Sequence, residues 1–330
     1  MVRLQGQLIA LDMSPLGLED TRRLADELLP PAQRRVLAAD GDAEVARSID
    51  GFGRYRVNAY LQRGMVGLVL RLVVSDVPSI AELNLPPIVE SMADEKRGLI
   101  LVTGPAGTGK TTTIAAMIGH INRTRRCHIL TLEDPIEVLH RDHLASIDQR
   151  EIGTDTPSFA AGLKFAVRQD PDVLFIGEIR DGEAAEAAVN AAETGHLVIS
   201  TMHTINASET LNRFIELFPA VRQMQVRTSL AGSLKAVICQ RLIPHADGKG
   251  RIPAVEVLLV NGRVADLITE HGRSVRLTTI MEEGASYGMQ TFDQSLVELV
   301  RQGLITADDA RAAATNRHDF GLALTKAALV

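Results

Sequence analysis

The chain has 330 residues, of which 45% are hydrophobic and 23% are charged, and its formal net charge is −6. This length and apolar content suffice for one large domain or two smaller ones with a sizeable core. The acidic balance and an aromatic content of 3% disfavour a dedicated nucleic-acid binder, because such proteins carry basic patches and often stack bases on aromatic rings. We therefore expect no nucleic-acid partner.

The cysteines and the apolar segments indicate the cellular setting. Cys127 and Cys239 are the only cysteines, and their separation matches no zinc motif, so a reducing cytosolic setting is expected. The N-terminus lacks the pattern of a signal peptide. The strongest apolar stretch, residues 66–74, is too short to span a membrane and contains Arg71. We expect no transmembrane segment, so any work at a membrane requires recruitment.

Residues 1–84 are expected to form a first domain of mixed helices and strands. The predicted elements are a helix over residues 18–29 and strands over residues 57–60 and 67–74. Pro30 and Pro31 would end the helix, because proline cannot continue it. The prolines of Leu85-Pro86-Pro87 mark the junction to a second domain, residues 85–330.

In residues 88–204, short apolar segments alternate with amphipathic ones. The candidate strands are Leu99–Thr103, His128–Leu132, Val173–Ile176 and Leu197–Thr201. The chain between them is long enough for crossover helices, which predicts an α/β fold with a mostly parallel sheet. Residues 205–330 are expected to be largely helical, with one long helix over residues 221–243 that Gly232 interrupts and Pro244 ends.

A phosphate-binding loop follows the first of these strands. Residues 104–111 read Gly-Pro-Ala-Gly-Thr-Gly-Lys-Thr, which is the G-x-x-x-x-G-K-[ST] pattern in its required setting between a strand and a helix. Its backbone N–H groups and the helix N-terminus favour phosphate. We expect Lys110 to reach the β- and γ-phosphates of ATP and Thr111 to ligate Mg²⁺. The predicted nucleotide-binding residues are Gly104, Pro105, Ala106, Gly107, Thr108, Gly109, Lys110, Thr111 and Thr112.

Two later strands end in carboxylates. Glu178 follows the strand over residues 173–176, which we expect beside the phosphate-loop strand with its carboxyl end facing the metal, so that Glu178 holds Mg²⁺ directly or through water. Glu133 follows the strand over residues 128–132, where it can orient the attacking water. A purely structural role for this second cluster stays open, because Asp134 begins an Asp-Pro turn.

Two histidines flank the strand over residues 197–201. His203 and Thr201 are expected at the sheet edge that carries both carboxylates, where a polar group can sense the γ-phosphate; His196 precedes the strand. A packing role for these histidines stays open, and metal ligation is disfavoured because no third ligand is spaced nearby.

The site also needs a cation for the charge that spreads over the γ-phosphate, a role worth about 10³–10⁵ in rate. The candidates in the first domain are Arg54, Arg56 and Arg71. Residue type alone does not choose among them.

Five ordered motifs resemble the type II/IV secretion ATPases, over about residues 35–315. Within that superfamily the chain is similar to the PilT-type pilus-retraction branch. The matching segments are residues 97–104 with the phosphate loop, Leu130-Thr-Leu-Glu-Asp-Pro-Ile-Glu137, Gln149-Arg150-Glu151, residues 168–181 and residues 192–204.

The resemblance implies a hexameric ring ATPase that powers type IV pilus retraction and twitching motility. Each subunit would combine a PAS-like α+β N-terminal domain with a RecA-like P-loop domain whose C-terminal part is helical. It would be cytoplasmic, lie peripherally at the inner membrane and act on a pilus platform protein there.

The resemblance also implies roles for individual residues. These are Walker A for Lys110 and Thr111, the Walker B glutamate for Glu178, the catalytic glutamate for Glu133, the His box for His196 and His203, and phosphate-contacting arginines for Arg56 and Arg71.

The chain departs from the family pattern in three places. It starts after the first helix and strand of the family's N-terminal domain, so about 25 residues are missing by length; the start is misassigned or the domain is shortened. Residues 263–268 lack the arginine-asparagine pair of an Ala-Ile-Arg-Asn-Leu-type helix, which weakens the case for retraction. With two cysteines, the chain lacks the tetracysteine zinc insert of the GspE- and PilB-type assembly ATPases.

Three alternatives remain open. One is a sibling motor, either an accessory pilus ATPase or the ATPase of a secretion apparatus. Another is a RecA-like nucleic-acid translocase, which would bind DNA or RNA in a salt-dependent way. The last is a nucleotide-binding scaffold without hydrolysis, which the presence of Lys110, Glu133 and Glu178 disfavours.

Overall fold

The chain forms two compact units, Met1–Val74 and Ser75–Val330. The structure, a computed structural model, describes residues 1–4, 7–270 and 275–327. The sequence placed the domain boundary after residue 84, whereas the contacts divide the chain after Val74. The difference arises because Ile80, which lies before the predicted boundary, packs into the core of the second unit.

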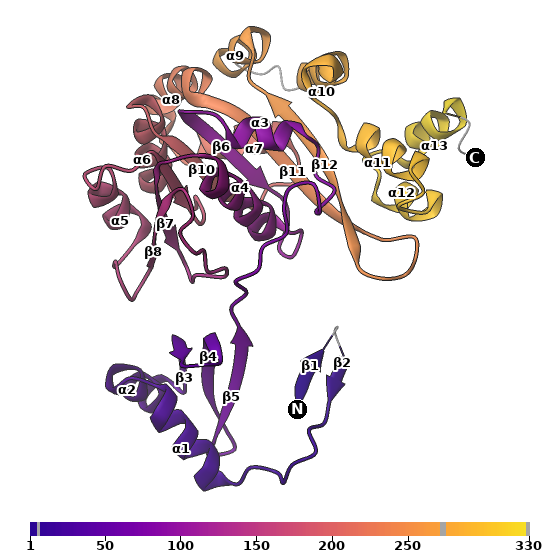
Figure 1. Ribbon diagram of the computed structural model, residues 1–330. Coiled ribbons are helices and arrows are strands. Elements are labelled where there is room, and N and C mark those ends of the chain that lie inside the picture. The colour runs from indigo at the N-terminus through magenta and orange to yellow at the C-terminus, as the bar shows by residue number, and fades with distance from the viewer. Residues whose placement is uncertain (5–6, 271–274, 328–330) are drawn as a thin grey trace. The chain divides into compact units, whose positions relative to one another are not determined.

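The first unit combines two helices with antiparallel strands (Figure 1). Its elements are β1 (Val2–Leu4), β2 (Gln7–Ile9), α1 (Leu18–Leu28), α2 (Pro31–Asp40), β3 (Asp42–Ile49), β4 (Gly53–Gln62) and β5 (Met65–Leu72). β1 and β2 form a hairpin, and β3, β4 and β5 form a sheet with β4 in the centre. Helix α1 and strands β4 and β5 confirm the predicted elements to within a few residues at their ends.

The two helices of this unit cover one face of its three-stranded sheet. Leu29 and Leu37 of the helical segment form an apolar cluster with Ala43 and Ala59 of the sheet. Pro31 occupies the first turn of α2, where a missing N–H costs nothing. The proline pair therefore ends one helix and also begins the next.

The second unit is built on a seven-stranded sheet with strand order β12-β11-β6-β10-β9-β7-β8. All neighbours are parallel except β11 and β12. Its elements are α3 (Ile88–Ala93), β6 (Gly98–Thr103), α4 (Lys110–Thr124), β7 (His128–Glu133), β8 (Ser146–Glu151), α5 (Phe159–Ala166), β9 (Val173–Ile176), α6 (Gly182–Glu193), β10 (Leu197–Met202), α7 (Ala207–Glu216), α8 (Ala220–Ser233), β11 (Leu234–Pro244), β12 (Arg251–Leu259), α9 (Gly262–Thr269), α10 (Val275–Glu283), η1 (Gly284–Tyr287), α11 (Phe292–Arg301), α12 (Ala307–Ala313) and α13 (Arg317–Lys326). The predicted α/β class and its four core strands are confirmed.

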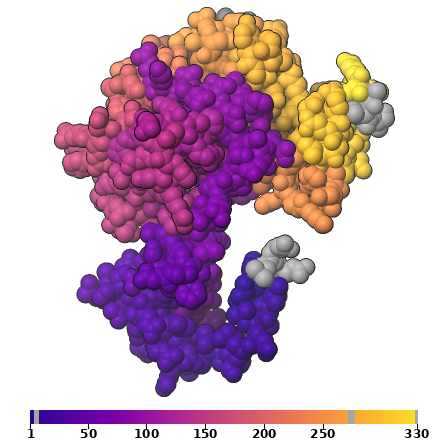
Figure 2. Space-filling view, viewed as in Figure 1, coloured from indigo at the N-terminus to yellow at the C-terminus, as the bar shows by residue number. Residues whose placement is uncertain are grey.

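Helices lie on both faces of this sheet. Alternate residues of β6 point to opposite faces, so Ile100 and Val102 pack with α3 and α4, and Leu99 and Leu101 pack in the cluster that contains α5 to α8. Both faces of the sheet are thus covered by apolar clusters, which is the arrangement expected for a parallel sheet. The C-terminal helices, yellow in the space-filling view, lie at the surface of this unit (Figure 2).

Two predictions about the second unit are wrong. The strand that precedes Glu178, β9, does not lie beside the phosphate-loop strand β6, because β10 pairs with both and separates them. Residues 221–243 are not one helix: α8 ends at Ser233, and the chain continues as β11, which pairs with β6.

The second error has a physical cause. Strand β11 is buried on both faces over most of its length, so its apolar residues do not alternate with polar ones, although Lys235, Gln240 and Arg241 interrupt them. A short apolar segment without alternation, such as residues 236–239, reads the same for a buried helix and a buried strand. With β11 and β12 in the sheet, the region predicted as largely helical, residues 205–330, is helical only before Leu234 and after Leu259.

In the part of the chain that the structure describes, we find no helix with both the length and the apolar character needed to cross a bilayer.

Candidate active site

The phosphate loop joins β6 to α4 through a close approach to β11. Gly104 has a φ of +145°, and a Cβ there would lie 2.6 Å from the Gln240 carbonyl oxygen and 2.6 Å from Thr108 Oγ1. Gly109 caps α4 in the left-handed region, with a φ of +88°. Thr108 Oγ1 donates a 2.9 Å hydrogen bond to the Pro105 carbonyl oxygen. The loop therefore requires glycine at Gly104 for space and at Gly109 for backbone conformation.

Lys110 is the first residue of α4 and is buried. Its Nζ donates to the carbonyl oxygens of Gly104 at 2.7 Å and Pro105 at 2.9 Å, and it lies 3.4 Å from His203 Nδ1. Burial lowers the pKa of Lys110, and the nearby carboxylates of Glu178 and Glu137 oppose that shift. The ammonium group thus lies inside the loop, among neutral acceptors that a phosphate oxygen can replace because phosphate carries the opposite charge.

Glu133 ends β7 on the face of the sheet that α4 covers, since Ile129 of the same strand packs in that cluster. Its side chain is buried, and its Oε1 accepts hydrogen bonds from Thr131 Oγ1 at 2.7 Å and from Gln149 Nε2 at 3.0 Å. Burial raises the pKa of Glu133, and these two donors oppose the rise. A buried carboxylate with a raised pKa is suited to accept a proton from water.

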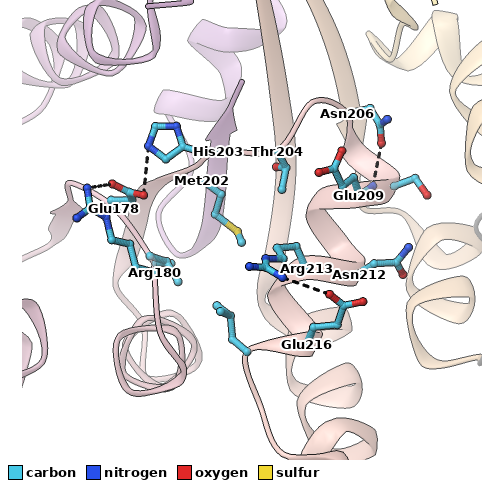
Figure 3. Close-up of a pocket in the computed structure, with 13 residues that line it drawn as sticks. Glu178, Arg180, Met202, His203, Thr204, Asn206, Glu209, Asn212, Arg213 and Glu216 are labelled. Carbon is cyan, nitrogen blue, oxygen red and sulfur yellow. Dashed lines mark hydrogen bonds and ion pairs between the residues drawn. The ribbon is translucent and has the colours of Figure 1, made fainter. Parts of the chain in front are cut away.

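Glu178 follows β9, the neighbour of β7 in the sheet. Its Oε2 lies 2.6 Å from an Arg180 guanidinium nitrogen, and its Oε1 lies 3.2 Å from His203 Nε2 (Figure 3). Thr201 Oγ1 donates a 2.6 Å hydrogen bond to the Gly177 carbonyl oxygen, which fixes the turn before Glu178 to the end of β10. His203 thereby connects Glu178 with Lys110.

The structure brings most of the predicted site residues together at one edge of the sheet. The phosphate loop, Glu133, Glu178 and His203 follow the carboxyl ends of β6, β7, β9 and β10, which are parallel strands. Ligands of open α/β sheets bind at this edge. His196 is not part of this group: it precedes β10 at the opposite end, where its Nδ1 lies 2.9 Å from the Ala191 carbonyl oxygen.

The two predicted arginines lie in the first unit. Arg56 of β4 and Arg71 of β5 are directly opposite each other in the antiparallel register. They lie on the face of the sheet opposite to Val57 and Ala59, whose side chains are buried. Arg56 also forms an ion pair with Glu44.

Comparison with known proteins agrees with this geometry. The family described as "Type II/IV secretion system protein" matches residues 81–282, more than half of the chain. The chain belongs to this family.

Individual relatives extend the similarity to nearly the whole chain. "Type IV pilus ATPase PilU" of Pseudomonas aeruginosa is 43% identical over 97% of this chain and 84% of its own length. "Type IV pilus retractation ATPase PilT" of the same organism is 38% identical over 97% of this chain and 92% of its own length. The crystal structure of the pilus retraction motor PilT with bound ADP matches with a TM-score of 0.88 and 42% identity, over 96% of this chain and 90% of that one. The resemblance predicted from the motifs is confirmed.

In the present chain, a cavity of about 400 Å³ adjoins the start of α4. It is lined by Gly109 and Thr112 on the loop side and by residues of β11, β12 and their connection on the other, among them Leu242, His245 and Ile252. Its size falls within the range of small-molecule sites. Sequence reasoning missed this cavity, because the β11 segment was predicted as helix and carries no motif.

A larger cavity, of about 810 Å³, adjoins the same edge beside Glu178 and His203 (Figure 3). Its far wall is helix α7, which contributes Asn206, Glu209 and Arg213. The lining contains acidic and basic side chains, and Arg213 pairs with Glu216 at 3.7 Å. This polar chamber was also absent from the sequence prediction, since residues 206–216 match no motif.

The described residues suit a magnesium ion that is held mainly by phosphate and water. Among them, no group of three or more His, Cys, Asp or Glu side chains is placed to bind a metal. Thr111, half-buried in the first turn of α4, and Glu178 provide a hydroxyl and a carboxylate oxygen. Oxygen donors in small number are typical of Mg²⁺ sites in nucleotide-binding proteins.

Proposed function

We propose that this chain is an ATPase that hydrolyses ATP at the phosphate loop and powers retraction of type IV pili. The observation that carries the proposal is the convergence of Lys110, Glu133 and Glu178 at the carboxyl edge of one parallel sheet. Relatives named as type IV pilus ATPases, at 43% and 38% identity, support the pilus assignment.

The triphosphate binds against the loop of residues 104–112. Backbone N–H groups and the N-terminus of α4 face the phosphates, and Lys110 exchanges its carbonyl acceptors for phosphate oxygens. The nucleoside occupies the cavity between Thr112 and Leu242. Binding of ATP thus uses both the sequence motif and the β11–β12 pair.

Mg²⁺, when bound, neutralises charge on the β- and γ-phosphates. Thr111 and Glu178 are the residues that would hold it, Glu178 directly or through water. In the structure Glu178 is bonded to Arg180 and His203. These partners orient the carboxylate, as partners of metal-binding carboxylates do.

Glu133 orients the attacking water and accepts its proton. The carboxylate lies at the end of β7, next to β9 and on the face that α4 covers. During transfer the negative charge of the γ-phosphoryl group is spread over its three equatorial oxygens. Lys110 and His203 lie close enough to each other, at 3.4 Å, to meet the same phosphoryl group. We assign Arg56 and Arg71 as further cations for the phosphates, on the strength of the family resemblance and of their pairing in the register.

The assembly and the partner belong to the same proposal. The chain acts as a subunit of a hexameric ring in the cytoplasm, peripheral to the inner membrane, and works on a pilus platform protein there. The ADP-bound PilT structure, which matches 96% of this chain, supports a shared architecture. An accessory pilus ATPase is the second candidate, because "Type IV pilus ATPase PilU", a name that does not mention retraction, is 43% identical over 97% of the chain.

The test of the proposed function is ATP turnover by Lys110→Ala beside the wild type. Loss of the ammonium group should abolish hydrolysis, whereas Lys164→Ala, at an exposed position of α5, should leave it unchanged. Restoration of twitching in a host that lacks its retraction ATPase would then separate a retraction motor from an accessory one. Undiminished turnover by the Lys110 variant would remove the basis of the assignment.

A further inference from the structure

Gln149 of β8 lies directly opposite Thr131 of β7 in the parallel register, and Glu151 lies opposite Glu133. Side chains alternate along a strand, so Thr131, Glu133 and Gln149 share one face of the sheet. Strand β8 is the edge strand of this sheet. The half-buried Gln149 is thus the neighbour of Glu133 on the outer side of the site.

The Gln149 amide uses both its donor and its acceptor side. Its Nε2 donates to Glu133 Oε1 at 3.0 Å and to the Val138 carbonyl oxygen at 2.9 Å, and its Oε1 accepts from the His140 N–H at 2.9 Å. A flipped amide would direct its oxygen at a carboxylate and a carbonyl, and its NH₂ group at an N–H. The three partners therefore permit one orientation only.

The same strand also holds the loop that follows Glu133. Glu151 Oε2 accepts from the Ile136 N–H at 3.3 Å. Together with the Val138 and His140 bonds of Gln149, this fixes the loop at three alternate residues. The loop carries Glu137, whose charge acts on both Lys110 and Glu133.

We propose that Gln149 is a positioning residue for hydrolysis, which fixes the Glu133 carboxylate toward the attacking water and holds the adjoining loop in place. The inference rests on the proposed function, in which Glu133 accepts the proton of water. Thr131 is the second donor to the same carboxylate oxygen, at 2.7 Å. Two donors on Oε1 restrict the rotation of the carboxylate in a way that burial alone does not.

The pH dependence of the rate reports the charge state of Glu133, and it would not change if Gln149 had only a structural role. Burial raises the pKa of Glu133, and the Thr131 and Gln149 donors lower it. The other charged or titratable groups on the surrounding elements include Glu137 and His140 in the loop, Glu151 on β8, Glu178 after β9 and Lys110 at the start of α4. A general base is lost as pH falls through its pKa. Removal of the Gln149 donor raises that pKa further, so the acid limb of the rate profile moves to higher pH.

The experiment measures kcat and KM for ATP against pH for Gln149→Ala, Gln149→Glu and the control Ser146→Ala. Ser146 is exposed on the same strand, and its side chain lies on the other face of the sheet. In Gln149→Ala we expect kcat to fall by about 10- to 100-fold, part of the 10²–10⁴ that a general base supplies, with KM unchanged. The acid limb should move to higher pH in that variant, and further in Gln149→Glu, where a carboxylate replaces the donor. Ser146→Ala should match the wild type.

Gln149→Glu has the shape of the native side chain and keeps the acceptor for the His140 N–H, so it tests the proposal even if the alanine variant does not fold. An unmoved acid limb in both variants, or a higher KM with unchanged kcat, would overturn the proposal. The proposed function is judged separately. It fails if Lys110→Ala hydrolyses ATP normally, whereas wild-type activity that depends on Lys110 but not on Gln149 overturns this inference alone.

Discussion

The phosphate loop depends on a glycine that touches its neighbours from two sides. Gly104 combines a φ of +145° with a missing Cβ that would otherwise meet Gln240 and Thr108 at 2.6 Å. An L-residue in such a conformation carries a strain of about 1–3 kcal/mol, and the contact with the β11 backbone cannot relax by rotation of a side chain. Substitution of Gly104 is therefore expected to be more damaging than substitution of a glycine that faces open space.

Gly104→Ala should consequently weaken ATP binding and lower the unfolding temperature. We expect at least a tenfold loss of affinity, about 1.4 kcal/mol, because the loop must shift away from β11. Equilibrium binding of a fluorescent ATP analogue and thermal unfolding check this. The control Gly232→Ala lies in α8 with open space at its Cβ position, and should be neutral or slightly stabilising. Wild-type affinity in Gly104→Ala would show that the loop has room that the structure does not indicate.

Glu133→Gln tests the general base directly. The substitution keeps size and one acceptor oxygen but removes the charge, so kcat should fall by about 10²–10⁴ while ATP still binds. In the wild type, burial raises the pKa of Glu133, so the acid limb of kcat should lie above the usual range of a glutamate. Steady-state rates from acid to neutral pH measure both effects. The exposed Glu193→Gln serves as the control, and turnover that survives in Glu133→Gln would assign the base to another group.

A buried carboxylate holds the start of helix α7. Glu256 of β12 is buried, and its Oε1 accepts a 2.7 Å hydrogen bond from the Ala207 N–H. Burial raises the pKa of Glu256, and the nearby Arg241 opposes the rise. Because the loop with His203 runs directly into α7, this bond links β12 to the phosphate side of the site.

The raised pKa has a defined consequence for stability. The folded protein binds the Glu256 proton more tightly than the unfolded chain does. The free energy of unfolding therefore falls as pH rises from the pKa of Glu256 in the unfolded chain to its higher pKa in the folded protein. Glu256→Gln removes this ionisation and keeps an acceptor for Ala207. The variant should therefore gain in unfolding temperature relative to the wild type as pH rises from 4 to 8. The exposed Glu282→Gln should show no such trend, and a gain at the acid end instead would mean that the folded state favours the ionised form.

The strands of the core and the phosphate loop were predictable from sequence for physical reasons. Val173–Ile176 is of strand length and is bounded by Pro171 and Gly177, which favours a strand over a helix. The loop motif specifies its own strand, turn and helix. Glu133 and Glu178 followed from the rule that parallel strands share one carboxyl edge. The spatial order of the strands did not follow, because a crossover helix of similar length can reach either the next strand or the one beyond it.

The parts of the site that come from β11 and β12 could not be predicted from the sequence. The apolar residues of β11 do not alternate with polar ones, because the strand is buried on both faces, so helix and strand are equally compatible with the pattern. The cavity beside Thr112 depends on that strand, so an error about one element removed the cavity from the prediction. Gln149 was recognised only as part of a motif, since its role depends on the register of β8 against β7.

The molecule as a whole separates the predicted charges between two units. The phosphate loop, both carboxylates and His203 belong to the second unit, and Arg56 and Arg71 belong to the first. If catalysis needs the arginines as well as the phosphate-loop residues, the enzyme is active only when both groups of side chains meet at the same nucleotide. In the proposed ring, activity and assembly are linked by mass action, since association stabilises the active form as concentration rises.

ATP turnover per subunit, measured against protein concentration for the wild type and for Arg56→Ala, tests this dependence. We expect the wild-type rate per subunit to rise with concentration, and Arg56→Ala to lose up to about 10³-fold in kcat, since a cation on the γ-phosphate is worth 10³–10⁵. Arg47→Ala is the matched control, because Arg47 is exposed on β3 of the same sheet and pairs opposite Tyr55, on the other face from Arg56. A rate that is independent of concentration and unchanged in Arg56→Ala would mean that the second unit hydrolyses ATP alone. The role proposed for the first unit, and the ring with it, would then have to be abandoned.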